Sequence, residues 1–250
     1  MKKDRFSAIG IKQSIRLEWM QETTNLILAG FSESEIKEGL SDYLSTRSGS
    51  GKEILRSTTT SQFARAILMK CWVNPESELI PLRDAGLTIL KDRMNNALPI
   101  HFGMLSAAYP YWYNIAFHLG RLLNLQKTVD ASRVLMRIKE NYGDKQTVTR
   151  TADYVFRSLV AWGLIEDKDR KGNYKKGKRI AIEEPRCAAF LLAASFYAID
   201  SCNIDFESLR HSPALFAFDL YSVSPEDLPK VCSTLEVTRI HNDTLVSKRR

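Results

Sequence analysis

A basic segment at residues 167–179 contains the side chains best suited to binding anions. Its sequence is DKDRKGNYKKGKR, with seven Lys or Arg and two Asp, a local charge of +5 against +7 for the whole 250-residue chain. Each contact between such a cation and a nucleic-acid phosphate releases a condensed counterion. Gly172 and Asn173 tolerate the positive φ angles that a hairpin turn needs. The segment therefore predicts the tip of a β-hairpin that contacts a polyanion in a salt-dependent way.

The residues before this segment predict three compact helices, at 111–126, 131–142 and 149–162. Only the short link KTVD and the tight turn GDKQ separate them, and such a turn joins two helices at a steep angle. Leu164 and Ile165 are expected to begin the first strand of the hairpin. We expect its second strand to be RIAIEE, with alternating side chains at Ile180 and Ile182.

The third of these helices is expected to present one apolar and one polar face. Val155, Leu159 and Trp162 recur at spacings of four and three, which predicts that they pack inward. Polar residues at the start of the helix are of types that contact base edges or phosphates, and the helix N-terminus adds partial positive charge. The residues predicted to contact DNA are Gln146, Thr147, Thr149, Arg150, Arg157, Lys168, Arg170, Lys171, Asn173, Tyr174, Lys175, Lys176, Lys178 and Arg179.

The run TVTRTADYVFRSLVAWGLIED resembles the winged helix-turn-helix family of DNA-binding proteins, and the resemblance covers about 70 of the 250 residues. It implies binding to double-stranded DNA, with the third helix in the major groove and the basic wing on phosphates. Winged helices also dock other proteins. The alternative is therefore an assembly subunit that uses this module, and its aromatic surface, to bind partner subunits.

A second resemblance extends into the N-terminal half. The stretches RSTTTSQFARAIL and PIHFGMLSAAYPYWYNIAFHLGRLLNLQ, joined to a winged helix, are similar in character to the BrxA-like accessory proteins of bacterial BREX anti-phage systems. This resemblance implies an accessory DNA-binding role in antiviral defence. Transcription regulation is the other context, and a sequence-specific regulator would be expected to bind palindromic sites as a homodimer.

The expected fold is mainly α, in three parts. They are a helical N-terminal domain at 1–98, a winged helix-turn-helix domain at 99–185, and a helical C-terminal segment at 186–250. Ser32 and Glu35 predict a capping box that begins a helix. Residues 99–110 are expected to be partly irregular. Short helices are expected at 213–221 and 225–232, and the tail is expected to end in a strand or hairpin turning at Asn242 and Asp243.

Other chemistries fit the sequence less well. The stretch STRSGSGKEI fails as a phosphate-binding P-loop, because Thr46 stands where the first glycine is needed and Glu53 follows the lysine. Arg47, Lys52 and Arg56 remain candidates for a second DNA contact. The aromatic residues around 109–117 suit either a base-stacking platform or, as we favour, the core or a subunit interface.

The remaining composition predicts a cytoplasmic, non-enzymatic protein without a cofactor or metal. The pI of about 9.2 favours nucleic acid as a partner, with an anionic membrane surface second. No apolar run is long enough to span a bilayer. The four histidines lack zinc-ligand spacing, and the four cysteines form no CxxC pair and are expected to stay reduced.

Overall fold

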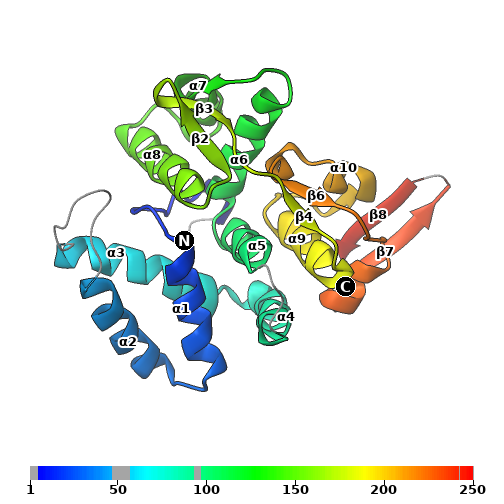
Figure 1. Ribbon diagram of the computed structural model, residues 1–250. Coiled ribbons are helices and arrows are strands. Elements are labelled where there is room, and N and C mark those ends of the chain that lie inside the picture. The colour runs from blue at the N-terminus through cyan, green and yellow to red at the C-terminus, as the bar shows by residue number, and fades with distance from the viewer. Residues whose placement is uncertain (1–4, 47–56, 93–96, 242, 250) are drawn as a thin grey trace.

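The computed structural model describes residues 5–46, 57–92, 97–241 and 243–249. The fold is mainly helical, as expected, with eleven α-helices and three small sheets among the described residues (Figure 1). Arg47, Lys52 and Arg56, the candidates for a second DNA contact, lie outside the described residues. None of the helices in the described ranges has the length and apolar character needed to cross a membrane.

The N-terminal region is built from four helices. They are α1 (Leu17–Leu28), α2 (Glu33–Ser45), α3 (Thr58–Leu68) and α4 (Ile80–Lys91), with a π-helical turn at Met69–Val73 after α3. The predicted capping box is confirmed at the start of α2. The Ser32 side chain accepts from the Glu35 amide, and the Glu35 carboxylate accepts from the Ser32 amide at 2.7 Å.

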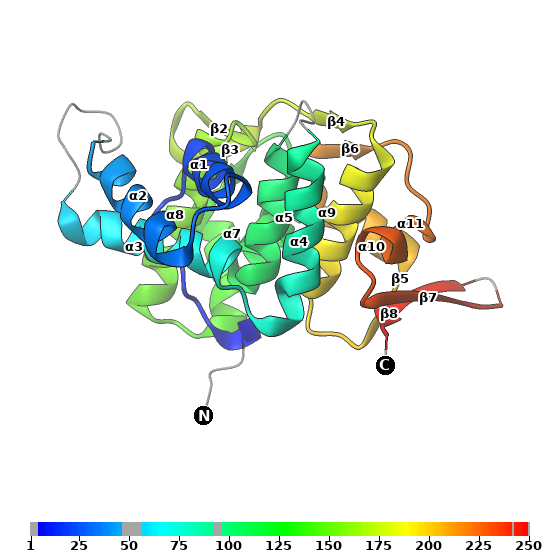
Figure 2. The same ribbon diagram turned by 90° about the horizontal axis from the view of Figure 1, so that it is seen from below.

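Helices α5 (Leu98–Ala108) and α9 (Pro185–Tyr197) form the centre of the molecule. Every residue of α5, and every residue of α9 from Cys187 on, is buried, and α4 packs beside them (Figure 2). Residues 99–110, expected to be partly irregular, are helical except for a break at Tyr109 between α5 and the helix that follows. Pro99 lies in the first turn of α5, where its missing N–H costs nothing, and Gly103 lets α5 approach Ala194 of α9 closely.

Six consecutive elements follow α5 and include the predicted basic segment. They are α6 (Pro110–Leu123), β1 (Val129–Asp130), α7 (Ala131–Tyr142), α8 (Gln146–Ala161), β2 (Ile165–Lys168) and β3 (Arg170–Lys176). The three strands form an antiparallel sheet in the order β1-β3-β2. Its central strand, β3, lies within the basic segment, with Tyr174 paired to Val129 on one side and to Asp167 on the other.

The hairpin differs from the one expected from the sequence. Asp169, with φ of 62°, forms the turn between β2 and β3, whereas Gly172, with φ of 86°, lies in an irregularity within the ladder. The strand predicted at Ile180 and Ile182 exists, but the prediction that it is the second strand of the hairpin is wrong. This strand is β4 (Ile180–Ile182), which pairs in parallel with β6 (Phe218–Leu220) of the C-terminal region. Alternating isoleucines predict a strand but do not identify its partner.

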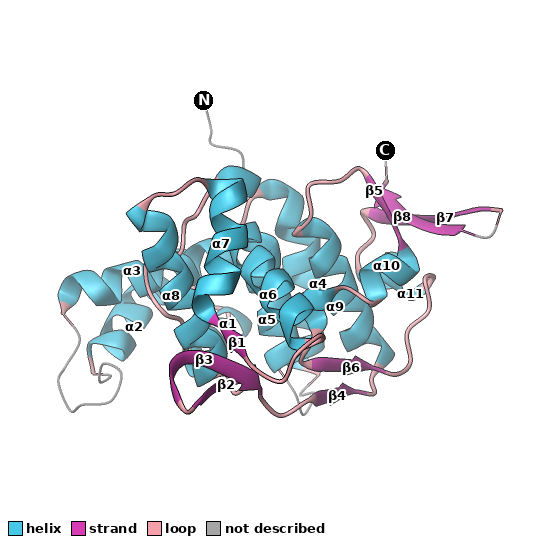
Figure 3. Cartoon of the chain, turned by 90° about the horizontal axis from the view of Figure 1, so that it is seen from above, coloured by secondary structure: helices cyan, strands magenta, loops and turns pink. Residues whose placement is uncertain are grey.

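The C-terminal region packs against α9 through α10 (Phe206–Arg210) and α11 (Asp227–Val231). It contains β5 (Asn203–Asp205), α10, β6, α11, β7 (Leu235–Ile240) and β8 (Asp243–Lys248). The terminal hairpin is confirmed, with β8 between β5 and β7 (Figure 3). Its turn includes His241, and Asn242 lies outside the described residues. The helix expected at 213–221 is instead a 3₁₀ turn at Pro213–Leu215 followed by β6.

Candidate nucleic-acid interface

Helix α6 holds α7 and α8 at their shared turn. Gly143, with φ of 82°, ends α7 and lets the chain reverse before α8 begins at Gln146. The Tyr111 hydroxyl donates to the Val148 carbonyl at 2.7 Å, and the Asn114 amide donates to the Tyr142 hydroxyl at 2.7 Å. These bonds come from neighbouring turns of α6. They therefore fix the position of the start of α8 relative to the end of α7.

Helix α8 has the two faces that its sequence predicts. Val155 and Leu159 are fully buried and Trp162 is nearly so, which confirms the predicted inward face. The opposite face is a stripe of exposed residues at helical spacing, namely Gln146, Arg150, Asp153, Arg157 and Ala161. The N-cap residue of α8, Lys145, makes no side-chain hydrogen bond to the first turn of the helix. The first backbone N–H groups of α8 therefore add positive potential beside Gln146.

The β2–β3 hairpin is held against α8 by an aromatic contact. The rings of Tyr174 on β3 and Phe156 on α8 have centroids 5.1 Å apart and planes inclined by 31°. Tyr174, one of the predicted contact residues, is buried, and this burial together with the nearby Asp167 charge raises its pKa to about 12. Its side chain therefore positions the hairpin instead of pointing outward. Figure 1 shows the hairpin beside α8.

Three of the seven predicted cations in the basic segment form ion pairs. Arg170 pairs with Asp130, Lys175 with Glu166 at 2.6 Å, and Arg179 with Asp219. Lys176 donates instead to the Asn124 side-chain oxygen at 2.7 Å. Exposed ion pairs of this kind contribute about 0–1 kcal/mol each, so that a phosphate oxygen can replace the carboxylate at little cost.

Five further cations, on α8 or in the basic segment, are exposed and form no ion pair with another described residue. They are Arg150 and Arg157 on α8, and Lys168, Lys171 and Lys178 in and after the hairpin. Because no carboxylate neutralises them, their field extends into solvent, where it can attract an anionic partner.

A hollow of about 510 Å³ lies where α8, the hairpin and the segment before α1 meet. Arg16, Arg157 and Lys171 line it, with Asp167 as its one carboxylate, and we call it the α8–hairpin hollow. The segment before α1 is held there by two hydrogen bonds. The Ile15 amide donates to the Ser158 hydroxyl at 2.8 Å, and the Trp162 indole donates to the Ile15 carbonyl at 2.9 Å.

Arg16 is a residue that the sequence did not identify. It precedes α1 in a stretch that signals only the start of a helix, and more than a hundred residues separate it from α8. The hydrogen bonds between Ile15 and the C-terminal end of α8 bring the neighbouring Arg16 side chain to the hollow.

The structure places the predicted contact residues in three classes of exposure. One is buried, Tyr174, and four are half-buried, Thr149, Asn173, Lys175 and Lys176. The exposed ones are Gln146, Thr147, Arg150, Arg157, Lys168, Arg170, Lys171, Lys178 and Arg179. The exposed set therefore comes from both α8 and the hairpin.

The aromatic residues around 109–117 belong mainly to the core. Tyr111, Trp112 and Tyr113 are buried, and Trp112 contacts Trp162 with ring centroids 5.3 Å apart. The interpretation of this cluster as a base-stacking platform is therefore wrong, because a stacking ring must be exposed to the base.

The described part of the chain holds no group of three or more His, Cys, Asp or Glu side chains that could bind a metal ion. Comparison of the chain with protein-family models, curated proteins and solved structures finds no match in any of the three.

Proposed function

We propose that residues 110–176 form a winged helix-turn-helix that binds double-stranded DNA. In this proposal α8 enters the major groove and the β2–β3 hairpin is the wing that lies on the phosphate backbone. The order of elements supports it: a helix, a short strand, two helices joined by a tight turn, and an antiparallel hairpin that pairs with the short strand.

The observation that carries the proposal is that unpaired cations of α8 and of the hairpin share one surface. Arg157 and Lys171 both line the α8–hairpin hollow, although they belong to different elements. The contact between Tyr174 and Phe156 keeps these two elements together. A helix and a hairpin so joined can contact bases and backbone at the same time.

The residues have different roles in this proposal. Gln146, Thr147 and Arg150, at the exposed start of α8, contact base edges. Arg157, Lys168, Lys171 and Lys178 contact phosphates, which fix the register of the protein on the duplex. Asp153 lies in the same stripe, and a carboxylate there can accept a hydrogen bond from the amino group of a cytosine while repelling phosphates. No cofactor and no catalytic step are part of this function.

A second candidate function is docking of a partner protein. Leu125, in the link between α6 and β1, is 80% exposed, and Met136 on α7 is 60% exposed. Exposed apolar side chains can contribute to a protein interface. The two functions use different surfaces, so that charge reversal on the hairpin distinguishes them.

The test is a charge-reversal experiment with a matched control. The variant Lys168→Glu/Lys171→Glu/Lys178→Glu is compared with Lys37→Glu/Lys91→Glu/Lys230→Glu, which makes the same change of net charge at exposed lysines of α2, α4 and α11. Binding to a fluorescein-labelled duplex is measured by anisotropy. The hairpin variant should lose at least about tenfold in affinity, and the control much less. Equal losses in both variants would overturn the proposal.

The biological context is proposed from the resemblance to BrxA-like proteins. It is an accessory role in phage defence, with other subunits of such a system as partners. Transcription regulation is the alternative context. The functions of neighbouring genes distinguish the two.

A further inference from the structure

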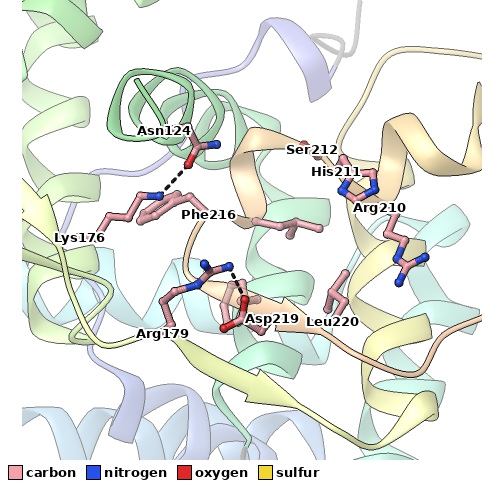
Figure 4. A pocket seen from close by; sticks show the side chains of 11 residues that line it. Asn124, Lys176, Arg179, Arg210, His211, Ser212, Phe216, Asp219 and Leu220 are labelled. Atoms are coloured by element: carbon pink, nitrogen blue, oxygen red, sulfur yellow. Dashed lines mark hydrogen bonds and ion pairs between the residues drawn. The ribbon is translucent and has the colours of Figure 1, made fainter. Parts of the chain in front are cut away.

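A second cavity is lined by the C-terminal residues of the basic segment, Lys176 and Arg179. Its volume is about 310 Å³, and it is bounded by the end of α6, the segment from β3 to β4, the end of α10, and β6. Figure 4 shows Lys176 and Arg179 on one side of it and Arg210 and His211 on the other, with Phe216 and Leu220 between them. The cavity thus combines cationic sides with an apolar floor.

The charges that line this cavity do not balance. Lys176, Arg179 and Arg210 carry three positive charges, and Asp219 is the one carboxylate among the lining residues, which leaves a net charge of +2. Asp219 is already paired with Arg179. Arg210 forms an ion pair with Glu207, which does not line the cavity, and its Nη1 lies 3.7 Å from the Glu207 Oε1, a long distance for an ion pair.

Lys176 is the cation with the weakest compensation. Its Nζ donates at 2.7 Å to the oxygen of a neutral amide, Asn124, and forms no ion pair with another described residue. Burial, followed by repulsion from Arg179, lowers its pKa, and attraction from Asp219 offsets these two effects only in part. A further anion in the cavity would stabilise the charged form of Lys176.

The geometry points to a binding site for a small organic anion that carries a phosphate group. Lys176 and Arg179 would bind the phosphate, Phe216 and Leu220 would contact the rest of the ligand, and Arg210 would add positive potential from the opposite side of the cavity. Guanidinium groups bind phosphate oxygens in pairs of parallel hydrogen bonds, and ligand sites typically combine a few such groups with apolar walls. Asp219 would remain bound to Arg179 and orient it.

This site is distinct from the proposed DNA surface, although the same strand contributes to both. Lys171 of β3 lines the α8–hairpin hollow, whereas Lys176, at the end of β3, lines this cavity. Arg210 belongs to α10 and is not among the residues proposed to contact DNA. It is therefore the residue with which the two functions are separated.

The experiment measures binding of inorganic phosphate to the full chain. Equilibrium dialysis with radiolabelled phosphate is carried out at constant pH, with ionic strength held constant by chloride. We expect saturable binding with one site per chain, and at least a tenfold weaker affinity in Lys176→Gln/Arg210→Gln. The control Arg239→Gln, an exposed arginine of β7 that pairs with Glu226, should bind phosphate like the unchanged protein.

Two results would overturn this site. One is binding that rises linearly with phosphate concentration in the unchanged protein. The other is an unaltered affinity in the double variant, with its fold verified by circular dichroism. Duplex binding by Arg210→Gln is measured in parallel and should be unchanged. A loss of duplex binding in Arg210→Gln would assign the cavity to the DNA backbone instead.

Discussion

The Tyr174 ring lies against the Phe156 ring with a centroid distance of 5.1 Å, and this contact joins the basic hairpin to α8. Both rings are buried, at 6% and 1% exposure. The other residues of the two hairpin strands are exposed or half-buried, except Ile165 at the start of β2, so that Tyr174 is the one buried residue of β3. The position of the cations relative to α8 therefore depends on this pair.

Removing the Tyr174 ring should destabilise the protein and weaken DNA binding together. Tyr174→Ala is expected to lower the free energy of unfolding by about 3 kcal/mol, because it deletes a buried aromatic side chain. Tyr174→Phe keeps the ring and should retain both stability and affinity. Urea denaturation and duplex anisotropy measure the two effects. Full duplex affinity in Tyr174→Ala would show that the hairpin need not be anchored for binding.

Asp153 should act against non-specific binding. Asp153→Asn removes a negative charge from the exposed stripe of α8, and we expect its affinity for a random duplex to rise by about threefold to tenfold at low salt. Asp42→Asn, which makes the same change at an exposed position of α2, serves as the control. If affinity for a random duplex falls or stays constant in Asp153→Asn, the stripe does not face the phosphates.

Gly177, directly after β3, should not tolerate a side chain. A Cβ built there lies 2.0 Å from the Gly163 carbonyl oxygen, a backbone atom that cannot move aside. Gly177→Ala is expected to cost about 3 kcal/mol of stability, because the end of the hairpin must shift away from α8.

Gly172→Ala is the matched control for this substitution. Gly172 has φ of 86° but nothing within 4 Å of a built Cβ, so that only left-handed strain of about 1 kcal/mol is added. Thermal melts of the two variants measure the difference. Equal melting temperatures would contradict the close approach of Gly177 to Gly163.

His101 should make the protein less stable in acid. It is fully buried on α5, edge-on to Trp72, and burial lowers its pKa from 6.5 to about 3. The unfolded chain therefore binds a proton below pH 6.5 that the folded chain does not. The free energy of unfolding should fall by about 1.4 kcal/mol per pH unit from this group as pH decreases from 6.5 toward 3.

The test for His101 compares the pH dependence of two proteins. His101→Gln removes the titrating group. Between pH 6.5 and 5, the variant should lose about 2 kcal/mol less of its free energy of unfolding than the unchanged protein loses. Urea denaturation at several pH values measures this difference. Parallel pH profiles for the two proteins would show that folding does not lower the pKa of His101.

Local patterns in the sequence predicted the helices well. The capping box of Ser32 and Glu35 and the inward face of Val155, Leu159 and Trp162 depend on residues within one or a few turns, and both are confirmed. Helix α5 was mistaken for a partly irregular segment, because it is apolar on all sides and has no helical periodicity to detect.

Long-range pairings were not predictable in the same way. Ile180 pairs with Phe218, and Arg16 lines the α8–hairpin hollow because Ile15 is hydrogen-bonded to α8. No local pattern in the sequence predicts that Ile180 pairs with Phe218 or that Ile15 contacts α8. The basic segment was identified from its charge. Which of its cations are exposed and which form ion pairs depends on distant groups such as Asn124 and Asp219. Only the structure therefore identifies Lys168, Lys171 and Lys178 as the exposed cations of the segment that form no ion pair with another described residue.

The salt dependence of duplex binding tests the central claim most directly. Anisotropy titrations of the unchanged protein with a random duplex of about 30 base pairs are carried out between about 50 and 200 mM salt. With Arg157, Lys168, Lys171 and Lys178 on phosphates, the logarithm of the binding constant should fall linearly with the logarithm of salt concentration, with a slope of about −3 to −4. No measurable binding at the lowest salt concentration, or a slope near zero, would contradict the proposal that this surface binds DNA.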